Sequence, residues 1–166
     1  RRRYTGQGVE SQGDNAVSAM LSPMKREGAM DDKWAKGMGI RRTVLGDAHV
    51  DRAEAVKTAF DAPFQELITD GAWGTVWASE AISMRERSML TLALLAATGN
   101  FDEIPMHIRA TVRTGATPSD VAEALQHVAI YAGVPRATRA LKIAKETYAE
   151  MEAEGDCPAP PPRPRQ

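Results

Sequence analysis

The sequence predicts an all-α protein that folds as a compact bundle of several helices. Hydrophobic residues make up 43% of the 166 residues, which is enough for a core, but aromatic residues only 5%, so alanine and leucine must fill most of it. Small apolar side chains of this kind pack helices closely. Helix start and stop signals recur along the chain, whereas no alternating run predicts a strand. The length suits a single domain.

The two ends of the chain differ in composition from the rest. Residues 1–29 are polar, rich in glycine and without periodicity, which indicates a flexible arm or a cloning remnant. Residues 155–166 hold five prolines and predict an extended, disordered tail. We therefore expect the helical domain over residues 30–154.

The first half of this domain carries weak helix signals. An irregular stretch is expected through Gly46, followed by helical spacing over residues 50–68 that Pro63 must kink or divide. The apolar residues at this spacing predict a buried stripe made of Val56, Phe60, Phe64, Leu67 and Ile68.

The second half carries clear helix signals. Ser83 and Glu86 fit a capping box that opens a helix over residues 84–97. Because this helix is apolar almost all round, we expect it to be the central, buried element. A further helix is expected over residues 102–114, with Pro105 in its first turn.

Glycine and proline mark the remaining boundaries. Gly115 is suited to a left-handed cap, and Thr117 and Pro118 then begin another helix, which Gly133 ends. Pro135 opens the last helix of the predicted bundle.

Composition and charge argue against several classes of function. The net charge of −1, from 21 basic and 22 acidic residues, predicts no electrostatic binding to nucleic acid or to an anionic membrane. The longest apolar run, residues 89–97, is much too short to span a bilayer. Cys157 is the only cysteine, so no internal disulfide or Cys-x-x-Cys pair can form, and a reducing cytoplasm is the expected compartment.

Five strings of the sequence carry a family resemblance when they are taken in order and at their spacing. They are IRRTVLGDAHVDRA (40–53), AWGTVW (72–77), RSMLTLALLAATG (87–99), HIRATVRTGATPSDVAEAL (107–125) and AIYAGVPRATRA (129–140). Together they closely resemble the carboxymuconolactone decarboxylase family. The resemblance implies an all-helical fold shared with alkylhydroperoxidase-like proteins and assembly into a homohexamer, a trimer of dimers.

The resemblance also implies a reaction, in which 4-carboxymuconolactone loses carbon dioxide to give 3-oxoadipate enol-lactone in the β-ketoadipate pathway of protocatechuate catabolism. The implied substrate is an unsaturated lactone with two carboxylates. The electron pair left by the broken carbon–carbon bond spreads through the ring double bond to the lactone carbonyl oxygen, so no metal and no organic cofactor is expected. The protein must supply a donor to this oxygen, a proton, and an anchor for the retained carboxylate.

The peroxide-reducing relatives within this fold carry Cys-x-x-Cys-x-x-x-His, with a glutamate twelve residues before the first cysteine. When the chain is aligned on His107, these positions hold Ser88, Asn100, Glu103 and His107, so both cysteines and the glutamate are replaced. Thiol-based peroxide reduction needs a thiolate and a resolving thiol, and the domain therefore lacks the groups for this activity.

His107 is the candidate donor or general acid, because an imidazole titrates near pH ~6.5 and reaches both proton states at working pH. The alternative is a structural histidine on a helix face. Glu103 lies four residues earlier on the same face, where it could hold the imidazolium or fix the tautomer. Its alternative is a surface carboxylate stabilised by the helix dipole. His49 and His127 are interpreted as structural or interface histidines.

Arginines are expected to bind the carboxylates of the substrate through paired hydrogen bonds. Arg87, next to Ser88, is the first candidate, and Arg41 or Arg42 is the second. Each could instead be a solvated or ion-paired surface group. Because clamping the departing carboxylate would stabilise the ground state, we expect the arginine to hold the acetate side chain.

Aromatic side chains are candidates for a drier wall beside the departing carboxylate, namely Trp73, Trp77 and Tyr131. The alternative for the two tryptophans is core packing, and Tyr131 could simply pack at a helix end.

Two other functions stay open on the sequence. The same histidine could serve a decarboxylase or isomerase of a related lactone or keto acid. The helical shell could also belong to a non-catalytic homo-oligomeric binding protein, although the histidine and the arginines in matching positions argue against this.

Overall fold

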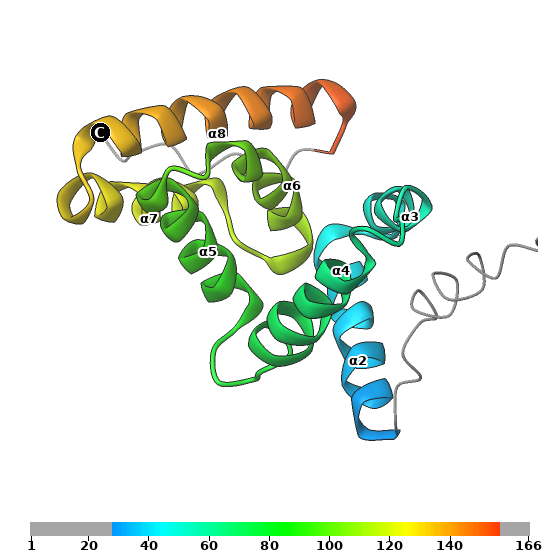
Figure 1. The fold of residues 1–166 in the computed structure, drawn as a ribbon. Coiled ribbons are helices and arrows are strands. Elements are labelled where there is room, and N and C mark those ends of the chain that lie inside the picture. The colour runs from blue at the N-terminus through cyan, green and yellow to red at the C-terminus, as the bar shows by residue number, and fades with distance from the viewer. Residues whose placement is uncertain (1–27, 157–166) are drawn as a thin grey trace, which may run out of the picture.

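The computed structural model describes residues 28–156, and every regular element in this part of the chain is a helix (Figure 1). The elements are α2 (Gly28–Leu45), α3 (Asp47–Ala55), α4 (Ala62–Ile68), the π-helix η1 (Thr69–Trp77), α5 (Met84–Thr98), the 3₁₀-helix η2 (Phe101–Glu103), α6 (Ile104–Thr114), α7 (Pro118–Tyr131) and α8 (Val134–Glu154). The prediction of an all-α fold is confirmed. The expected arm and tail fall almost entirely outside the described residues and stay predictions.

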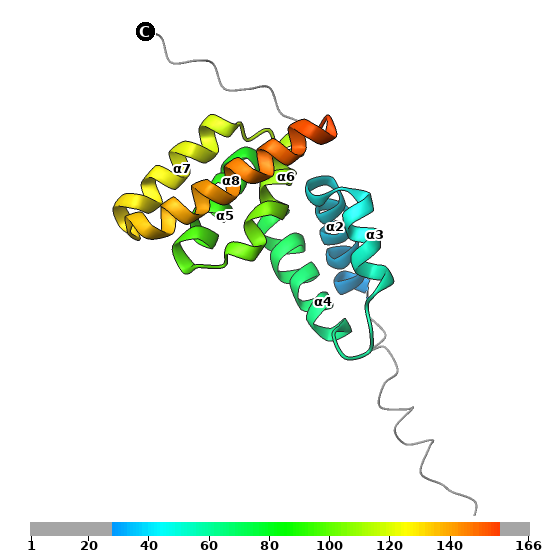
Figure 2. The ribbon, with the colours of Figure 1, turned by 90° about the horizontal axis from the view of Figure 1, so that it is seen from above.

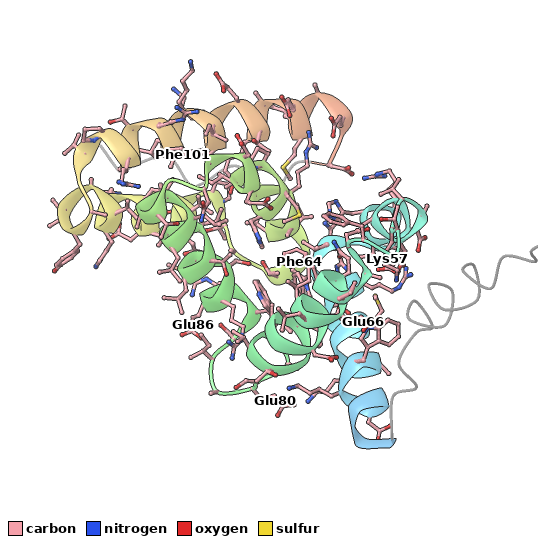
Figure 3. All side chains as sticks on the ribbon, viewed as in Figure 1. Lys57, Phe64, Glu66, Glu80, Glu86 and Phe101 are labelled. Carbon is pink, nitrogen blue, oxygen red and sulfur yellow. The ribbon has the colours of Figure 1, made fainter. Side chains whose placement is uncertain are left out.

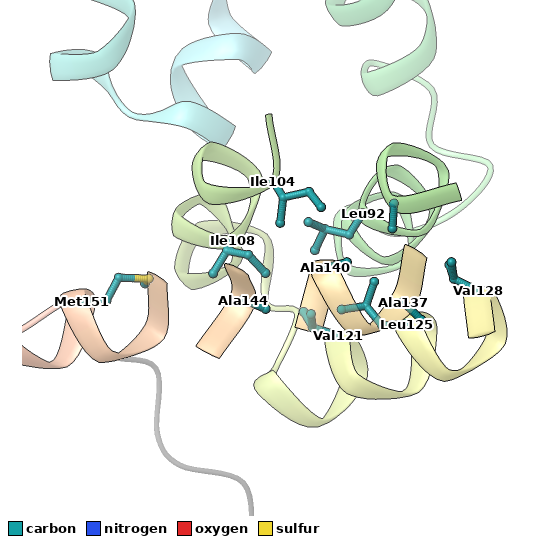
Figure 4. Close-up of a cluster of buried hydrophobic side chains, with 11 residues drawn as sticks. Leu92, Ile104, Ile108, Val121, Leu125, Val128, Ala137, Ala140, Ala144 and Met151 are labelled. Carbon is teal, nitrogen blue, oxygen red and sulfur yellow. The ribbon is translucent and has the colours of Figure 1, made fainter. Parts of the chain in front are cut away.

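The helices form two groups that meet at α6. Figures 1 and 2 show α5, α7 and α8 on one side of α6, and α2 and α3 on the other. The larger core, drawn in Figure 4, consists of Leu92, Ala96, Ile104, Ile108, Val121, Leu125, Val128, Ala137, Ala140, Ala144 and Met151. The smaller core consists of Val44, Leu45, Val50, Trp73, Trp77 and Ala110.

Helix α6 is held by both cores. Ile104 and Ile108 lie four residues apart and therefore share the face that packs into the larger core, whereas Ala110 packs into the smaller one. None of the three is accessible to solvent. The rotation of α6 about its axis is therefore fixed, and with it the direction in which His107 points.

The backbones of α2 and η1 touch, and at two positions only glycine permits this. A Cβ atom added at Gly37 would lie 2.4 Å from the carbonyl oxygen of Thr69. One added at Gly74 would lie 2.7 Å from the carbonyl oxygen of Lys33. This close crossing holds η1, and with it the two tryptophans of the smaller core, against α2.

The π-helix η1 places Trp73 and Trp77 side by side. Both side chains are buried, and their ring centroids lie 5.3 Å apart at an angle of 31°. The wider turns of a π-helix are rare and occur frequently at functional sites.

The predicted helix boundaries of the second half are confirmed. The Ser83 hydroxyl accepts a hydrogen bond from the Glu86 amide, and the Glu86 carboxylate accepts one of 2.7 Å from the Ser83 amide, which completes the capping box. Thr117 caps α7 through the same arrangement with Asp120. Gly115 ends α6 in the left-handed conformation, with φ of 82°.

The expectation of an irregular stretch through Gly46 is wrong, because α2 continues to Leu45 and α3 begins directly after Gly46. Few apolar residues mark α2 at helical spacing, so its own sequence gives a weak signal. Much of its support is tertiary. It crosses η1 at Gly37, and Arg113 of α6 donates hydrogen bonds of 2.9 Å to the carbonyl groups of Val44 and Leu45.

The predicted buried stripe over residues 50–68 is also wrong. In the described chain the exposed fraction is 76% for Val56, 96% for Phe60, 59% for Phe64 (labelled in Figure 3) and 67% for Leu67. The segment forms two short helices joined by a turn, so these residues do not share one helical face. Pro63 lies in the first turn of α4 and does not interrupt a longer helix.

Helix α5 is less enclosed than its apolar sequence predicted. Leu92 and Ala96 are fully buried in the larger core. Leu90 and Leu94, on the opposite face, are 54% and 63% exposed. Within the described chain α5 is therefore an outer helix and not a central one.

The crossing of α2 and η1 predicts opposite effects of two neighbouring substitutions. Gly37→Ala should lower the free energy of unfolding by about 1–3 kcal/mol, since its Cβ meets backbone atoms that cannot rotate away. Gly39→Ala, where no atom lies within 4 Å, should leave it unchanged or raise it by up to about 1 kcal/mol. Urea unfolding measures both. Equal effects of the two substitutions would contradict the close approach.

Candidate active site

His107 lies on α6 beside the two tryptophans. Its ring is nearly parallel to that of Trp77, at an angle of 14° and with 6.4 Å between the ring centroids. Trp77 in turn packs against Trp73. Both predicted tryptophans are thus part of the core and also form a wall next to the imidazole.

Burial makes His107 a neutral imidazole. Desolvation, and to a smaller extent the charge of His49, lowers its pKa from 6.5 to about 4. The half-buried ring makes no hydrogen bond within the described residues. At neutral pH the free protein therefore presents an uncharged ring, which can donate from one nitrogen and accept at the other.

His49 lies near His107, at the beginning of α3, although the sequence suggested only a structural or interface role for it. Burial is the largest cause that lowers the pKa of His49, followed by the charges of Arg52, Arg41 and Arg113. Arginines from three different helices, α2, α3 and α6, therefore lie close enough for their charges to act on this imidazole. No sequence signal pairs His49 with His107, because tertiary packing alone brings α3 to α6.

Arg41 is the predicted anchor that the structure brings to this cluster. Its side chain is 5% exposed, and burial lowers its pKa. Nη2 donates to Gln65 Oε1 at 3.3 Å, and Nη1 lies 3.5 Å from Glu54 Oε1. Nε and Nη1 form no hydrogen bond within the described residues. A buried guanidinium with unused donors is an expected feature of an anion-binding site.

The other predicted arginines are placed differently. Arg42 forms ion pairs with Asp47 at 3.0 Å and Asp51 at 2.8 Å near the protein surface. Arg87 is buried and donates through Nη2 to the carbonyl oxygen of Ser79 at 2.8 Å, while its Nε has no partner in the described chain. Arg87 thus fixes the segment after η1, and no contact joins it to the two histidines within the described residues.

Three further candidates lie outside the cluster or at its edge. Ser88 is buried, and its hydroxyl is 2.7 Å from that of Thr114, a contact that ties α5 to α6. Glu103 is exposed and forms no hydrogen bond with His107; its charge acts on His49 instead. Tyr131 is 84% exposed and packs against His127 at the end of α7.

The described residues offer no group of three or more histidine, cysteine, aspartate or glutamate side chains that could hold a metal ion. None of the helices between residues 28 and 156 is both long and apolar enough to cross a membrane.

The fold and the histidine helix agree with what comparison with known proteins finds. The carboxymuconolactone decarboxylase family matches residues 62–146, which include His107 and both tryptophans. The chain belongs to this family, as its five sequence strings suggested, and it is a decarboxylase like its relatives of that name.

Three relatives match over most of their own lengths. The 4-carboxymuconolactone decarboxylase of Acinetobacter baylyi is 34% identical over 121 residues, which cover 73% of this chain and 90% of the relative. The nitrosuccinic acid decarboxylase of Metarhizium robertsii is 35% identical over 125 residues, or 75% and 87% of the two chains. A 4-carboxymuconolactone decarboxylase of Pseudomonas putida is 51% identical over 47 residues, 27% of this chain and 98% of that sequence.

The lowered pKa of His107 predicts a loss of stability in acid. Between pH ~6.5 and about 4 the unfolded chain binds a proton at this residue that the folded chain does not, so the free energy of unfolding should fall as the pH is lowered through this range. The His107→Gln variant should show a shallower fall in urea unfolding measured at several pH values. His127→Gln, at an exposed position, should keep the original slope. The same slope in both variants would contradict the neutral, buried ring.

Proposed function

We propose that the chain is a carboxy-lyase that converts 4-carboxymuconolactone to 3-oxoadipate enol-lactone, as a cytoplasmic step in protocatechuate breakdown. Family membership and two named relatives of nearly full length support the decarboxylase class. The observation that carries the proposal is the uncharged His107, with free ring nitrogens, stacked on Trp77 and close to His49, on which the charges of three arginines act.

The reaction requires a hydrogen-bond donor to the lactone carbonyl oxygen, and His107 is the candidate for it. When the bond to the departing carboxylate breaks, its electron pair forms a new ring double bond, and negative charge builds on the lactone carbonyl oxygen. The N–H of a neutral imidazole can donate to this oxygen. One preorganised donor of this kind contributes about 3 kcal/mol by analogy with oxyanion holes. A proton delivered to the ring carbon beside the carbonyl completes the product.

Substrate binding would also change the proton affinity of His107. The two carboxylates of a bound substrate bring negative charge close to the ring and raise its pKa from about 4 towards its ordinary value. The ring is therefore unprotonated in the free protein, whereas in the complex a larger fraction of it carries the proton to be delivered. Proton delivery by His107 is thereby coupled to a filled site.

Arg41 is the predicted anchor that we favour for the retained carboxylate. It is buried near His49 and has unused donors, whereas Arg42 is saturated by two aspartates. Arg87 keeps one unpaired nitrogen and stays a second candidate. Trp73 and Trp77 form the apolar wall beside the imidazole, which favours loss of charge from the departing carboxylate.

A second candidate substrate is a nitro dicarboxylic acid, because one relative is a nitrosuccinic acid decarboxylase at 35% identity. A nitro group on the carbon that loses carbon dioxide accepts the electron pair as a lactone carbonyl does. The requirement for a donor at the developing oxyanion and for a carboxylate anchor is then unchanged.

The proposal includes assembly into a homo-oligomer, a hexamer built as a trimer of dimers. Its support is the amount of apolar surface that the single chain leaves uncovered, above all Phe60, Phe64 and Leu67 around α4 and Leu90 and Leu94 on α5. Exposed apolar surface of this extent is typical of contact surfaces in soluble proteins.

Incubation with 4-carboxymuconolactone tests the reaction. The purified chain should consume the lactone and release one equivalent of carbon dioxide without an added cofactor, while His107→Ala should lower kcat by roughly 10²–10⁴-fold. His127→Ala is the control and should keep nearly full activity. Turnover of nitrosuccinate alone would select the second candidate. Turnover of neither compound, with dicarboxylates that still bind, would favour a binding protein.

Light scattering tests the assembly. The wild-type chain should elute as an oligomer, and Phe60→Asp should reduce its mass, since a buried charge at the subunit contact is costly. Ser119→Asp, which adds the same charge at an exposed polar position of α7, should leave the mass unchanged. A monomeric wild-type protein would refute the oligomer.

A further inference from the structure

A cavity of about 350 Å³ lies between the α2–α3 turn, α6 and the end of α8. Its volume is in the range of small-molecule sites. The lining residues from the first segment are Leu45, Gly46, Asp47, Ala48, His49 and Arg52, and those from α6 are Met106, Arg109, Val112 and Arg113. Met151 and Asp156 close it from α8 and the residues after it. Four of these side chains are basic or imidazole groups.

The arginines on the cavity wall differ in whether a carboxylate pairs with them. Arg109 pairs with Glu150 and Glu154 of α8, so its charge is compensated. Arg52 is exposed and makes no hydrogen bond or ion pair within the described residues. Arg113 donates only to backbone carbonyl groups, which carry no full negative charge.

Two carboxylates also line the cavity and could neutralise these arginines. Asp47 is engaged by Arg42 outside the cavity, at 3.0 Å. Asp156 faces the cavity at the far end, after α8, and forms no ion pair with the arginines within the described residues. The wall that runs from His49 through Arg52 to Arg113 therefore has cationic groups without a matching anion.

Gly46 keeps this wall compact. Its φ of 86° is a conformation that other residues rarely adopt, and a Cβ atom there would lie 3.3 Å from Cζ of Arg113. The guanidinium lies directly against the turn because the glycine has no side chain. Arg113 is thus held in place at the cavity without help from a carboxylate.

His49 belongs to the cavity and to the catalytic cluster at the same time. It lines the cavity, and it is close enough to His107 to influence that ring. His49 and Arg52 are three residues apart on α3 and so share a face. His107 does not itself line the cavity, and His49 is the lining residue whose charge acts on it.

We propose that this cavity is the carboxylate subsite of the active site, in which Arg52 and Arg113 hold the carboxylate that the product retains. The inference rests on the proposed function, and it makes short dicarboxylates the class of ligand that the protein binds. Arg41 of α2, whose charge also acts on His49, then adds to the positive charge that holds this carboxylate, and the departing carboxylate lies on the apolar side, next to Trp77.

Binding of succinate tests the subsite without any turnover, because succinate has no group that can accept the electrons of decarboxylation. Calorimetric titration at constant ionic strength should show succinate binding. Arg52→Gln should weaken succinate binding about tenfold, the size expected for one charge-assisted pair. Lys142→Gln, which removes an equal charge from an exposed pair with Glu146 away from the cavity, should change it less than about twofold.

Kinetics with the lactone give a second, separate measurement. Arg52→Gln should raise KM by a similar factor with kcat largely kept, and Arg52→Lys should restore part of the loss. Normal lactone turnover with unchanged KM and unchanged succinate binding in Arg52→Gln would overturn the subsite and leave the proposed function intact. Succinate binding that depends on Arg52, in a protein with no lactone turnover, would support the subsite and refute the proposed substrate.

Discussion

The structure depends on one constraint, which is that α6 is packed on two faces at once. Ile104 and Ile108 are locked in the larger core, and Ala110 in the smaller one. A helix buried on one face can rotate slightly to relieve a poor contact, but a helix buried on two faces cannot do so without opening one of them. His107 therefore keeps its direction towards Trp77, and the candidate active site forms where the two cores meet.

Several arginines lie close together at the site, and keeping them without anionic partners lowers the stability of the folded chain. Arg41 is buried with unused donors, and Arg52 and Arg113 have no carboxylate partner among the described residues. Unpaired charges and donors destabilise a folded chain, and they persist where a ligand later satisfies them. Burial lowers the pKa of His107 and is also the largest cause for His49, on which the charges of the arginines act as well. A dianionic ligand would thus remove the electrostatic cost and raise the proton affinity of the candidate imidazoles together.

The two relatives that match most of this chain have names that specify different substrates. A lactone and a nitro dicarboxylic acid are alike in having an internal electron acceptor and a second carboxylate. A site that supplies a donor, an apolar wall and a carboxylate anchor meets both sets of requirements. The functional difference between such relatives then lies in the shape of the space around the acceptor, which residue identity at His107 does not decide.

The sequence by itself determined the helices whose ends carry local chemistry. The capping box of Ser83, the left-handed Gly115 and the Thr117 cap are set by neighbouring residues, so they could be recognised without a fold. Five strings taken together, one of them around His107, indicated the family. Tertiary structure decided the rest. The helix α2 depends on a backbone contact at Gly37, the stripe around Phe60 is exposed because the chain turns between α3 and α4, and His49 and Arg52 reach the site only through packing against α6. Contacts between residues far apart in the chain leave no periodic trace in sequence, which is why the cationic wall could not be predicted and the histidine could.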